Sequence, residues 1–517
     1  MTVCVSGQKS DSFAPISNLF LIAPDTDFFD FLNEIDELVN FYPEIITAIE
    51  RDLEEDSKRK KLIRLADKKY IEESTPPLPD VTVCDNDINE IDLTMEIGRP
   101  RMPTYLVYIF LMIRGNLGSL TSRKARTFLK ESISLHIFLE NHGLTLPCRT
   151  TLQDNVNCVS NATRNLIFDC QLRKVQAEGL DDFEKLLIDS TSVSANSAWP
   201  TDAKIINGLI SRIHRLGRKF HKFGFINFKV FRMEDWLKEM DSLEFTINLT
   251  AGKANSKGKL KKHYRQLLNR GLQALAFLAE ELVSFEERYA PYSGLLPSRL
   301  ICLENVIAQM KDDMFSAFYV IEYTQNRVLN GKQLKSTQKI LSLSDKAAAY
   351  IKKGNRNPVI GYKAQLGRSG NGFVTSLIVP EGNAADSGKL LPVTLDTTSR
   401  TGVIPGLVNV DDGYASRAGV DGLHDMGVRH VSISGAKGRK LTSEEDWNNE
   451  EYRTARSDRS AVESLMFTLK YCFEFGRLRR TEIEAVRAEL LEKVIAYNIC
   501  RAIALKQAAA KEVKKAA

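Results

Sequence analysis

The hydrophobic pattern changes at Lys185, and this change constrains the fold more than any other feature of the sequence. The run LLIDSTSV, which starts at Leu186, is short and apolar and contains an acid, as is typical of a buried strand. A hairpin signal follows at Gly370–Asn371–Gly372, between GYKAQLGRS and GFVTSLIVP. Residues 185–475 then run strand, helical block, strand, strand, helix, strand, helix, strand, helix. This order predicts an α/β fold in which helices cover a mixed sheet.

The domain boundaries follow from the same pattern and from composition. A stretch rich in proline and turn formers separates an acidic helical head from the rest of the chain. The predicted divisions are an acidic helical region with a linker at 1–97, a helical region at 98–180, an α/β domain made of 185–202 and 336–475, a basic helical insertion at 203–335, and a helical C-terminal region at 476–517.

Composition narrows the class of protein. A chain of 517 residues should hold two to four domains, and it has no apolar run long enough to cross a bilayer and no secretion signal. Its eight cysteines form no CxxC pair, which argues against a thiolate zinc site and fits a reducing cytoplasm. Residues 1–97 hold 22 acids and 9 bases, whereas the remainder holds 44 acids and 62 bases. This asymmetry favours a polyanionic partner for the basic body, although plain solubility would explain it equally well.

Three acids occupy comparable positions. Asp189 and Asp411 end the apolar strands KLLID and GLVNVD, and Glu463 lies on a late helix. Carboxylates at strand ends and on a covering helix can converge at the edge of a sheet. Three hard oxygen ligands suit Mg²⁺ or Mn²⁺, and a pair of such ions about 3.5–4 Å apart can promote phosphodiester chemistry. The pattern alone is weak support, because a chain with 66 acids contains many possible triples.

The stretch RSDRSAVESLMFTLK, residues 456–470, predicts an amphipathic helix. At 100° per residue, Arg459, Glu463 and Lys470 fall within about 40° of one another, away from the apolar stripe. A surface ion-pair ladder would also explain one acid between two cations.

Five motifs occur in a fixed order: LLIDSTSV followed by WPTD, KGNRNPVIGYKAQL before the hairpin, EGNAAD opening a helix, VDDGYAS, and R-x3-E-x6-K at Arg459, Glu463 and Lys470. In this order they resemble a DDE transposase of the bacterial insertion-sequence type, whose catalytic domain has a ribonuclease H-like fold. The resemblance covers about 185–475 and, more loosely, 98–180. It departs from the family at Arg456, where a tyrosine is frequent.

The resemblance implies roles for these residues. Asp189, Asp411 and Glu463 would be catalytic and would bind a Mg²⁺ or Mn²⁺ pair, while Asp412 would simply be solvated. Double-stranded DNA, as transposon terminal inverted repeats and as target, would be the partner of a homodimer or larger assembly in the cytoplasm (nucleoid). The residues expected to bind DNA are Arg459, Lys470, Arg456, Lys259, Lys261, Lys262 and Arg265. For the basic insertion, an ordinary solvated helix face is an equal alternative.

The implied activity is metal-dependent 3′-end nicking followed by strand transfer. Two alternatives stay open. One is a transposase-derived DNA-binding protein that has lost its chemistry, and the other is a different ribonuclease H-like DNA nuclease.

Overall fold

The computed structural model describes residues 28–74, 102–117, 127, 129–197, 201–289, 292, 294–335, 338–352 and 357–516. Much of the predicted linker, and the first part of the acidic head, therefore lie outside the described residues. The chain divides into two compact units, each described by itself below. Unit 1 comprises 1–54, 102–197 and 347–517, and unit 2 comprises 55–101 and 198–346.

Unit 1 is built on a mixed sheet, and β1 is its central strand. β1 pairs antiparallel with β3 on one side and parallel with β5 on the other, and β5 pairs parallel with β6. β2 and β4 both pair antiparallel with β3, giving the order β2-β3-β1-β5-β6 with β4 off this path. This arrangement confirms the predicted α/β, ribonuclease H-like mixed sheet. The strands are β1 (Lys185–Ser194), β2 (Ala349–Ile351), β3 (Val359–Ser369), β4 (Val374–Ile378), β5 (Leu407–Val410) and β6 (His430–Ile433).

The hairpin predicted at Gly370–Asn371–Gly372 joins β3 to β4. Gly372 has φ 97°, a conformation that glycine adopts without strain, and its N–H donates to the carbonyl of Ser369 at 3.2 Å. The short strand β2 was not predicted, because three residues are too few to give a periodic signal.

Helices cover both faces of the sheet. Leu186 and Ile188 of β1 share a core with Leu390 of α13 and Leu423 of α14. Alternate side chains point to the opposite face, where the amide of Asn409 donates to the Ala455 carbonyl of α17 and where α18 packs on β1. The covering helices are α13 (Leu390–Thr401), α14 (Arg417–Asp425), α15 (Ala436–Leu441), α16 (Glu444–Asn448), α17 (Glu450–Ser457) and α18 (Ser460–Cys472).

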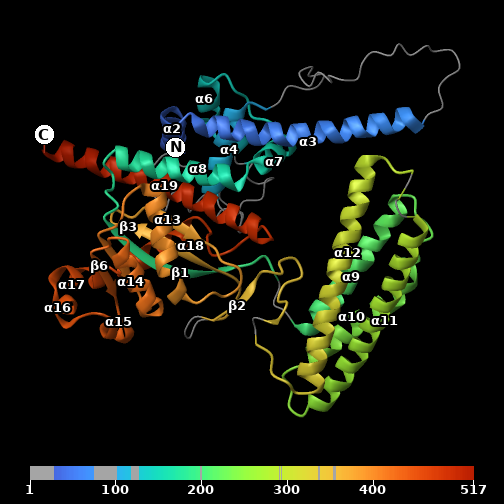
Figure 1. Cartoon of the computed structure of the whole chain (residues 1–517). Helices are drawn as coiled ribbons and strands as arrows, with labels where there is room; N and C mark the ends of the chain where they lie inside the picture. Colours follow the sequence, from blue (N-terminus) through green and yellow to red (C-terminus); the bar gives the residue numbers. More distant parts are fainter. Residues whose placement is uncertain are drawn as a thin grey trace, which may run out of the picture. The chain divides into compact units, whose positions relative to one another are not determined.

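A helical layer completes unit 1, and its longest member is α19 near the C-terminus (Figure 1). The Asn498 side chain in α19 pairs with both the N–H and the carbonyl of Val374, at 2.9 and 2.8 Å, so α19 docks on the edge strand β4. Gly115 allows α4 to approach α19, because a Cβ there would lie 2.2 Å from the Glu492 carbonyl oxygen. The helices are α2 (Phe28–Phe41), α3 (Glu44–Ser74, to Glu54 in this unit), α4 (Thr104–Asn116), α6 (Ile133–Asn141), α7 (Arg149–Cys158), α8 (Asn161–Ala177) and α19 (Ile483–Ala516).

Unit 2 contains four long helices that lie side by side (Figure 1). The first begins where the sequence predicted, at Asp202, and the Thr201 side chain accepts from the Lys204 N–H as its N-cap. Their apolar faces form one buried core. The helices are α9 (Asp202–Lys222), α10 (Glu234–Thr250), α11 (Lys257–Tyr289) and α12 (Pro297–Thr324). Among the described residues, no helix is long and apolar enough to span a membrane.

Two predicted helices differ in detail. The stretch 456–470 is not one helix, because α17 ends at Ser457 and α18 begins at Ser460, with the Lys185 ammonium bound to Asp458 at the break. EGNAAD does not open α13 directly, because a 3-10 turn at Asp386–Gly388 comes first and the Asp386 carboxylate contacts β3.

Candidate active site

Asp189 and Asp411 lie on neighbouring parallel strands, just beyond the ladder that joins the two strands. Asp411 follows the last residue of β5, but Asp189 is the fifth residue of β1, which continues to Ser194 because it pairs there with β3. The prediction that Asp189 ends its strand was therefore wrong. The β1–β5 ladder pairs Leu187 with Asn409, and each acid follows two residues later. Side chains two residues apart in a strand share a face, so both acids point to the face on which Asn409 contacts α17. The sequence therefore places two carboxylates together on one face of the sheet.

The Asp411 carboxylate contacts a backbone N–H and an arginine. Its Oδ1 accepts from the Gly413 N–H at 2.8 Å, which holds the side chain against a 3-10 turn, Asp412–Tyr414. Its Oδ2 lies 3.5 Å from Nη2 of Arg459, whose other terminal nitrogen donates to the Ser434 hydroxyl at 3.0 Å. Arg459, the residue directly before α18, thus contacts an acid of the site.

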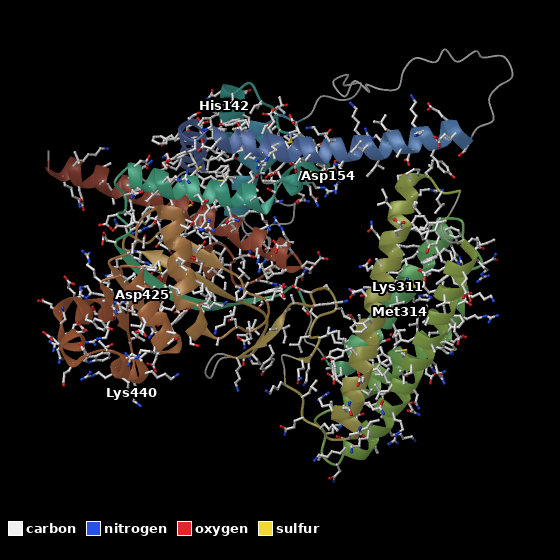
Figure 2. The ribbon with its side chains drawn as sticks, viewed as in Figure 1. His142, Asp154, Lys311, Met314, Asp425 and Lys440 are labelled. Atoms are coloured by element: carbon white, nitrogen blue, oxygen red, sulfur yellow. The ribbon has the colours of Figure 1, made fainter. Side chains whose placement is uncertain are left out.

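Asp412 has a structural role, so the expectation of a merely solvated side chain was wrong. Its Oδ1 accepts from the backbone N–H groups of Lys437 and Gly438, at 2.7 and 3.0 Å, in the first turn of α15. Figure 2 labels Lys440 on this helix. A Cβ at Gly435, where φ is 111°, would come within 2.7 Å of the Asp412 Cγ, so this close approach requires glycine.

Glu463 lies on α18, the helix that packs on β1 on the side to which Asp189 and Asp411 point. Its side chain is exposed, whereas Val462 and Leu465 of the same helix are buried. Lys470 is half-buried and follows seven residues later, which on a helix gives nearly the same direction about 10 Å further along the axis. Beside them, the exposed rings of Phe467 and Tyr471 lie 4.3 Å apart.

The donor chemistry of Asp189, Asp411 and Glu463 fits a hard divalent cation, because all three offer carboxylate oxygens. Among the described residues, these three do not form a group whose ligand atoms all lie within 4.8 Å of one another. Like charges repel, so without a cation these carboxylates need not converge, and the exposed Glu463 has a long side chain that can change its direction.

In the described part of the chain, a different group of three carboxylates does have ligand atoms within 4.8 Å of one another: Glu34, Glu37 and Glu178. Lys174 lies 2.7 Å from Glu34, and Lys506 lies 2.8 Å from the same carboxylate. Two ammonium groups therefore already offset most of the charge of the three carboxylates. It joins α2, α8 and α19 as an ion-pair network.

A buried series of hydrogen-bonded polar side chains lies behind the site and was not predicted from the sequence. The Tyr414 hydroxyl donates to Gln365, whose amide donates to Asp386 at 2.8 Å, and Lys363 lies 2.7 Å from Asp386. Burial raises the pKa of Tyr414 well above its usual range, and the charges of Asp386, Asp189 and Asp411 raise it further. This series links the Asp411 turn to β3, and Lys363 and Asp386 also line a cavity of about 270 Å³. The D-x-G-Y motif contained the signal, since it places a tyrosine three residues after the acid.

Arg456 is held away from the acids. Its guanidinium carbon lies 3.9 Å from the ring centre of Trp447 and its Nη2 donates to the Trp447 carbonyl at 3.0 Å. In this structure Arg456 packs α17 against α16. The remaining predicted DNA-binding residues, Lys259, Lys261, Lys262 and Arg265, lie exposed on α11 in unit 2.

The mixed sheet, with Asp189 on β1 and Asp411 directly after β5, defines a domain of the ribonuclease H-like class. Residues 330–499 match the family model of the transposase DDE domain, and the chain thus carries such a domain. Comparisons with curated proteins and with solved structures found no match. Asp411 and Glu463 lie within the matched residues, whereas Asp189 lies before them. Because β1 is the central strand, the sheet is discontinuous in sequence, with residues 198–346 of unit 2 between β1 and the other strands.

Proposed function

We propose that this chain is a DNA transposase that nicks the 3′ ends of an insertion sequence and joins them to target DNA. The observation that carries the proposal is the placement of Asp189 and Asp411 on one face of two paired parallel strands, each two residues beyond the last pair of their ladder, with the helix that bears Glu463 packed on β1. The transposase family implies a DNA substrate.

The three acids would hold Mg²⁺ or Mn²⁺. When bound, these ions polarise a water or hydroxyl nucleophile and neutralise charge on the leaving oxygen. Water is the nucleophile that frees the 3′-OH, and that hydroxyl then attacks a phosphodiester of the target, so no covalent bond to the protein is needed. Arg459 orients Asp411 and limits its repulsion from Asp189.

Several basic residues would bind the DNA backbone. Lys470 extends from the same side of α18 as Glu463, so it is suited to a phosphate near the cleaved end. Arg456 and Arg459 would border the same end, and the exposed cations of α11 would grip terminal inverted repeats or target DNA. A homodimer or larger assembly would bring two ends together.

The family match supports transposase over other ribonuclease H-like nucleases. An inactive DNA-binding descendant is disfavoured because Asp189, Asp411 and Glu463 are all present beside Arg459 and Lys470.

Metal binding tests the assignment. Mn²⁺ titrations followed by electron paramagnetic resonance should show binding to the wild type in complex with end DNA and at least tenfold weaker binding to Asp189→Asn and Asp411→Asn. Asp412→Asn is the matched control, because its amide oxygen can still accept the α15 hydrogen bonds, and it should bind as the wild type does. Equal binding by Asp411→Asn and Asp412→Asn would remove Asp411 from the metal site.

A further inference from the structure

Unit 1 contains a second cavity, of about 750 Å³, formed by α4, α7, α8 and the start of α19. Asp154 is labelled on α7 in Figure 2. One wall is apolar, with Phe110, Leu152 and Val156 among its residues, and the other carries charge. The volume falls within the range of small-molecule sites, roughly 300–1,000 Å³.

The charged wall has an excess of cations. Arg114, Arg164 and Arg480 all donate to one buried carboxylate, Glu492, at 2.6–3.3 Å. Burial alone would raise the pKa of Glu492, but the three guanidinium charges outweigh it and hold that pKa far below its usual range. Three guanidinium groups thus share one buried carboxylate.

The other acids of the charged wall do not offset this excess of positive charge. Glu489 lies 2.8 Å from Lys493, and Glu484 lies 2.5 Å from Arg487, so each already has its own cation. Burial and then repulsion from Arg480 and Arg164 lower the pKa of Arg114 to about 10, although Glu492 opposes this. Within the described part of the chain, the cluster of three arginines and Glu492 keeps two positive charges in excess.

Some N–H groups of Arg114 and Arg480 also have no hydrogen-bond acceptor among the described residues. A guanidinium has five N–H donors. Arg480 uses two of them on Glu492, and Arg114 uses two there and one on Asn157. Among the described residues, three donors of Arg480 and two of Arg114 therefore remain for a ligand. An anion with several oxygens would fit them.

We propose that this cavity binds a nucleoside phosphate, with the phosphate on Arg114 and Arg480 and the base against Phe110, Leu152 and Val156. The ligand is either a free nucleotide or the phosphorylated end of a DNA strand, since both offer the same group. The site belongs to the helical layer of unit 1 and does not depend on the acids of the proposed metal site.

Calorimetric titration of the full chain with deoxyadenosine monophosphate tests this inference. Binding is expected, with deoxyadenosine and inorganic phosphate each at least tenfold weaker. Arg480→Ala should weaken binding at least tenfold and Arg480→Lys less, whereas Arg477→Ala, a nearby exposed arginine outside the cavity lining, should change nothing. Thermal melting verifies that each variant is folded.

A short 5′-phosphorylated oligonucleotide distinguishes the two sources. If it displaces the mononucleotide at lower concentration, the site takes a strand end; if it does not compete, the site takes free nucleotide. No binding of the monophosphate or the oligonucleotide, binding of deoxyadenosine as tight as that of its monophosphate, or equal binding by Arg480→Ala and Arg477→Ala would overturn the inference. None of these measurements involves cleavage or metal, so they can fail while the transposase proposal stands.

Discussion

Asp189 and Asp411 point to the same face of the sheet from two neighbouring parallel strands, Asp189 within β1 and Asp411 directly after β5. Each lies two residues beyond a registered pair of the ladder, so the pleat alone brings the two carboxylates together. Residues 222 apart in the sequence thereby share one face of the sheet, although residues 198–346 of unit 2 separate β1 from the other strands in the sequence.

Substitution of the neighbouring acids Asp411 and Asp412 should have different effects. Asp411→Asn should abolish nicking of end DNA with little loss of stability. Asp412→Ala should lower the free energy of unfolding by about 0.5–2 kcal/mol through loss of the α15 hydrogen bonds. Denaturant titration and a nicking assay on both proteins check this. Full activity in Asp411→Asn would show that the wrong aspartate has been assigned.

Arg459→Ala should slow nicking at least tenfold, which is about 1.4 kcal/mol of activation free energy. The cause is that Asp411 and Ser434 lose their guanidinium partner, while folding should lose less than about 1 kcal/mol because the ion pair is partly exposed. Single-turnover nicking is the measurement, with the exposed Arg453→Ala in α17 as control. Equal rates for the two variants would contradict an orienting role for Arg459.

The exposed cations of α11 should contribute salt-dependent DNA affinity. For the combined alanine variant of Lys259, Lys261, Lys262 and Arg265, the slope of log affinity against log salt should fall by about 0.9 for each phosphate that these side chains neutralise in the wild type. Fluorescence anisotropy at several salt concentrations measures this slope. Replacing Lys68 and Lys69, exposed on α3, is the control. An unchanged slope would favour a solvated helix face on α11.

Cys148 should be unusually reactive. Hydrogen bonds with the hydroxyls of Thr150 and Thr151 lower the pKa of its exposed thiol to about 6, because they stabilise the thiolate. Its alkylation rate should therefore rise through pH 6 and level off by pH 7, and Thr151→Val should move this rise to higher pH. Mass spectrometry of iodoacetamide adducts measures the rate, with exposed Cys302 as the internal comparison. No change in the pH profile of Thr151→Val would exclude this cause.

The sequence predicted those parts of the fold that rest on local periodicity. The strand at Leu186, the hairpin at Gly370–Gly372 and the helix beginning at Asp202 all occur where the pattern placed them. The ribonuclease H-like sheet was expected from the ordered motifs and their resemblance to transposases, whereas the expectation that β1 ends at Asp189 was wrong because the strand continues to Ser194 beside β3.

Contacts between segments distant in the sequence could not be predicted from local periodicity. The role of Asp412 depends on a helix that begins 24 residues later, and Glu492 meets Arg114 across 378 residues. The break before Arg459 carries no proline or glycine, and Asp458 at the break is bound by Lys185 of β1, 273 residues away. These features arise from tertiary packing, for which no periodic signal exists.

The most direct test of the central claim is cleavage of DNA that carries the element's own ends, with Mg²⁺ or Mn²⁺, by the wild type and by Glu463→Gln. The account predicts metal-dependent nicking at the ends by the wild type and none by the variant, with DNA binding retained in both. If both proteins bind the ends and neither cuts in either metal, or if the variant cuts as the wild type does, the proposed catalytic role of these acids is contradicted.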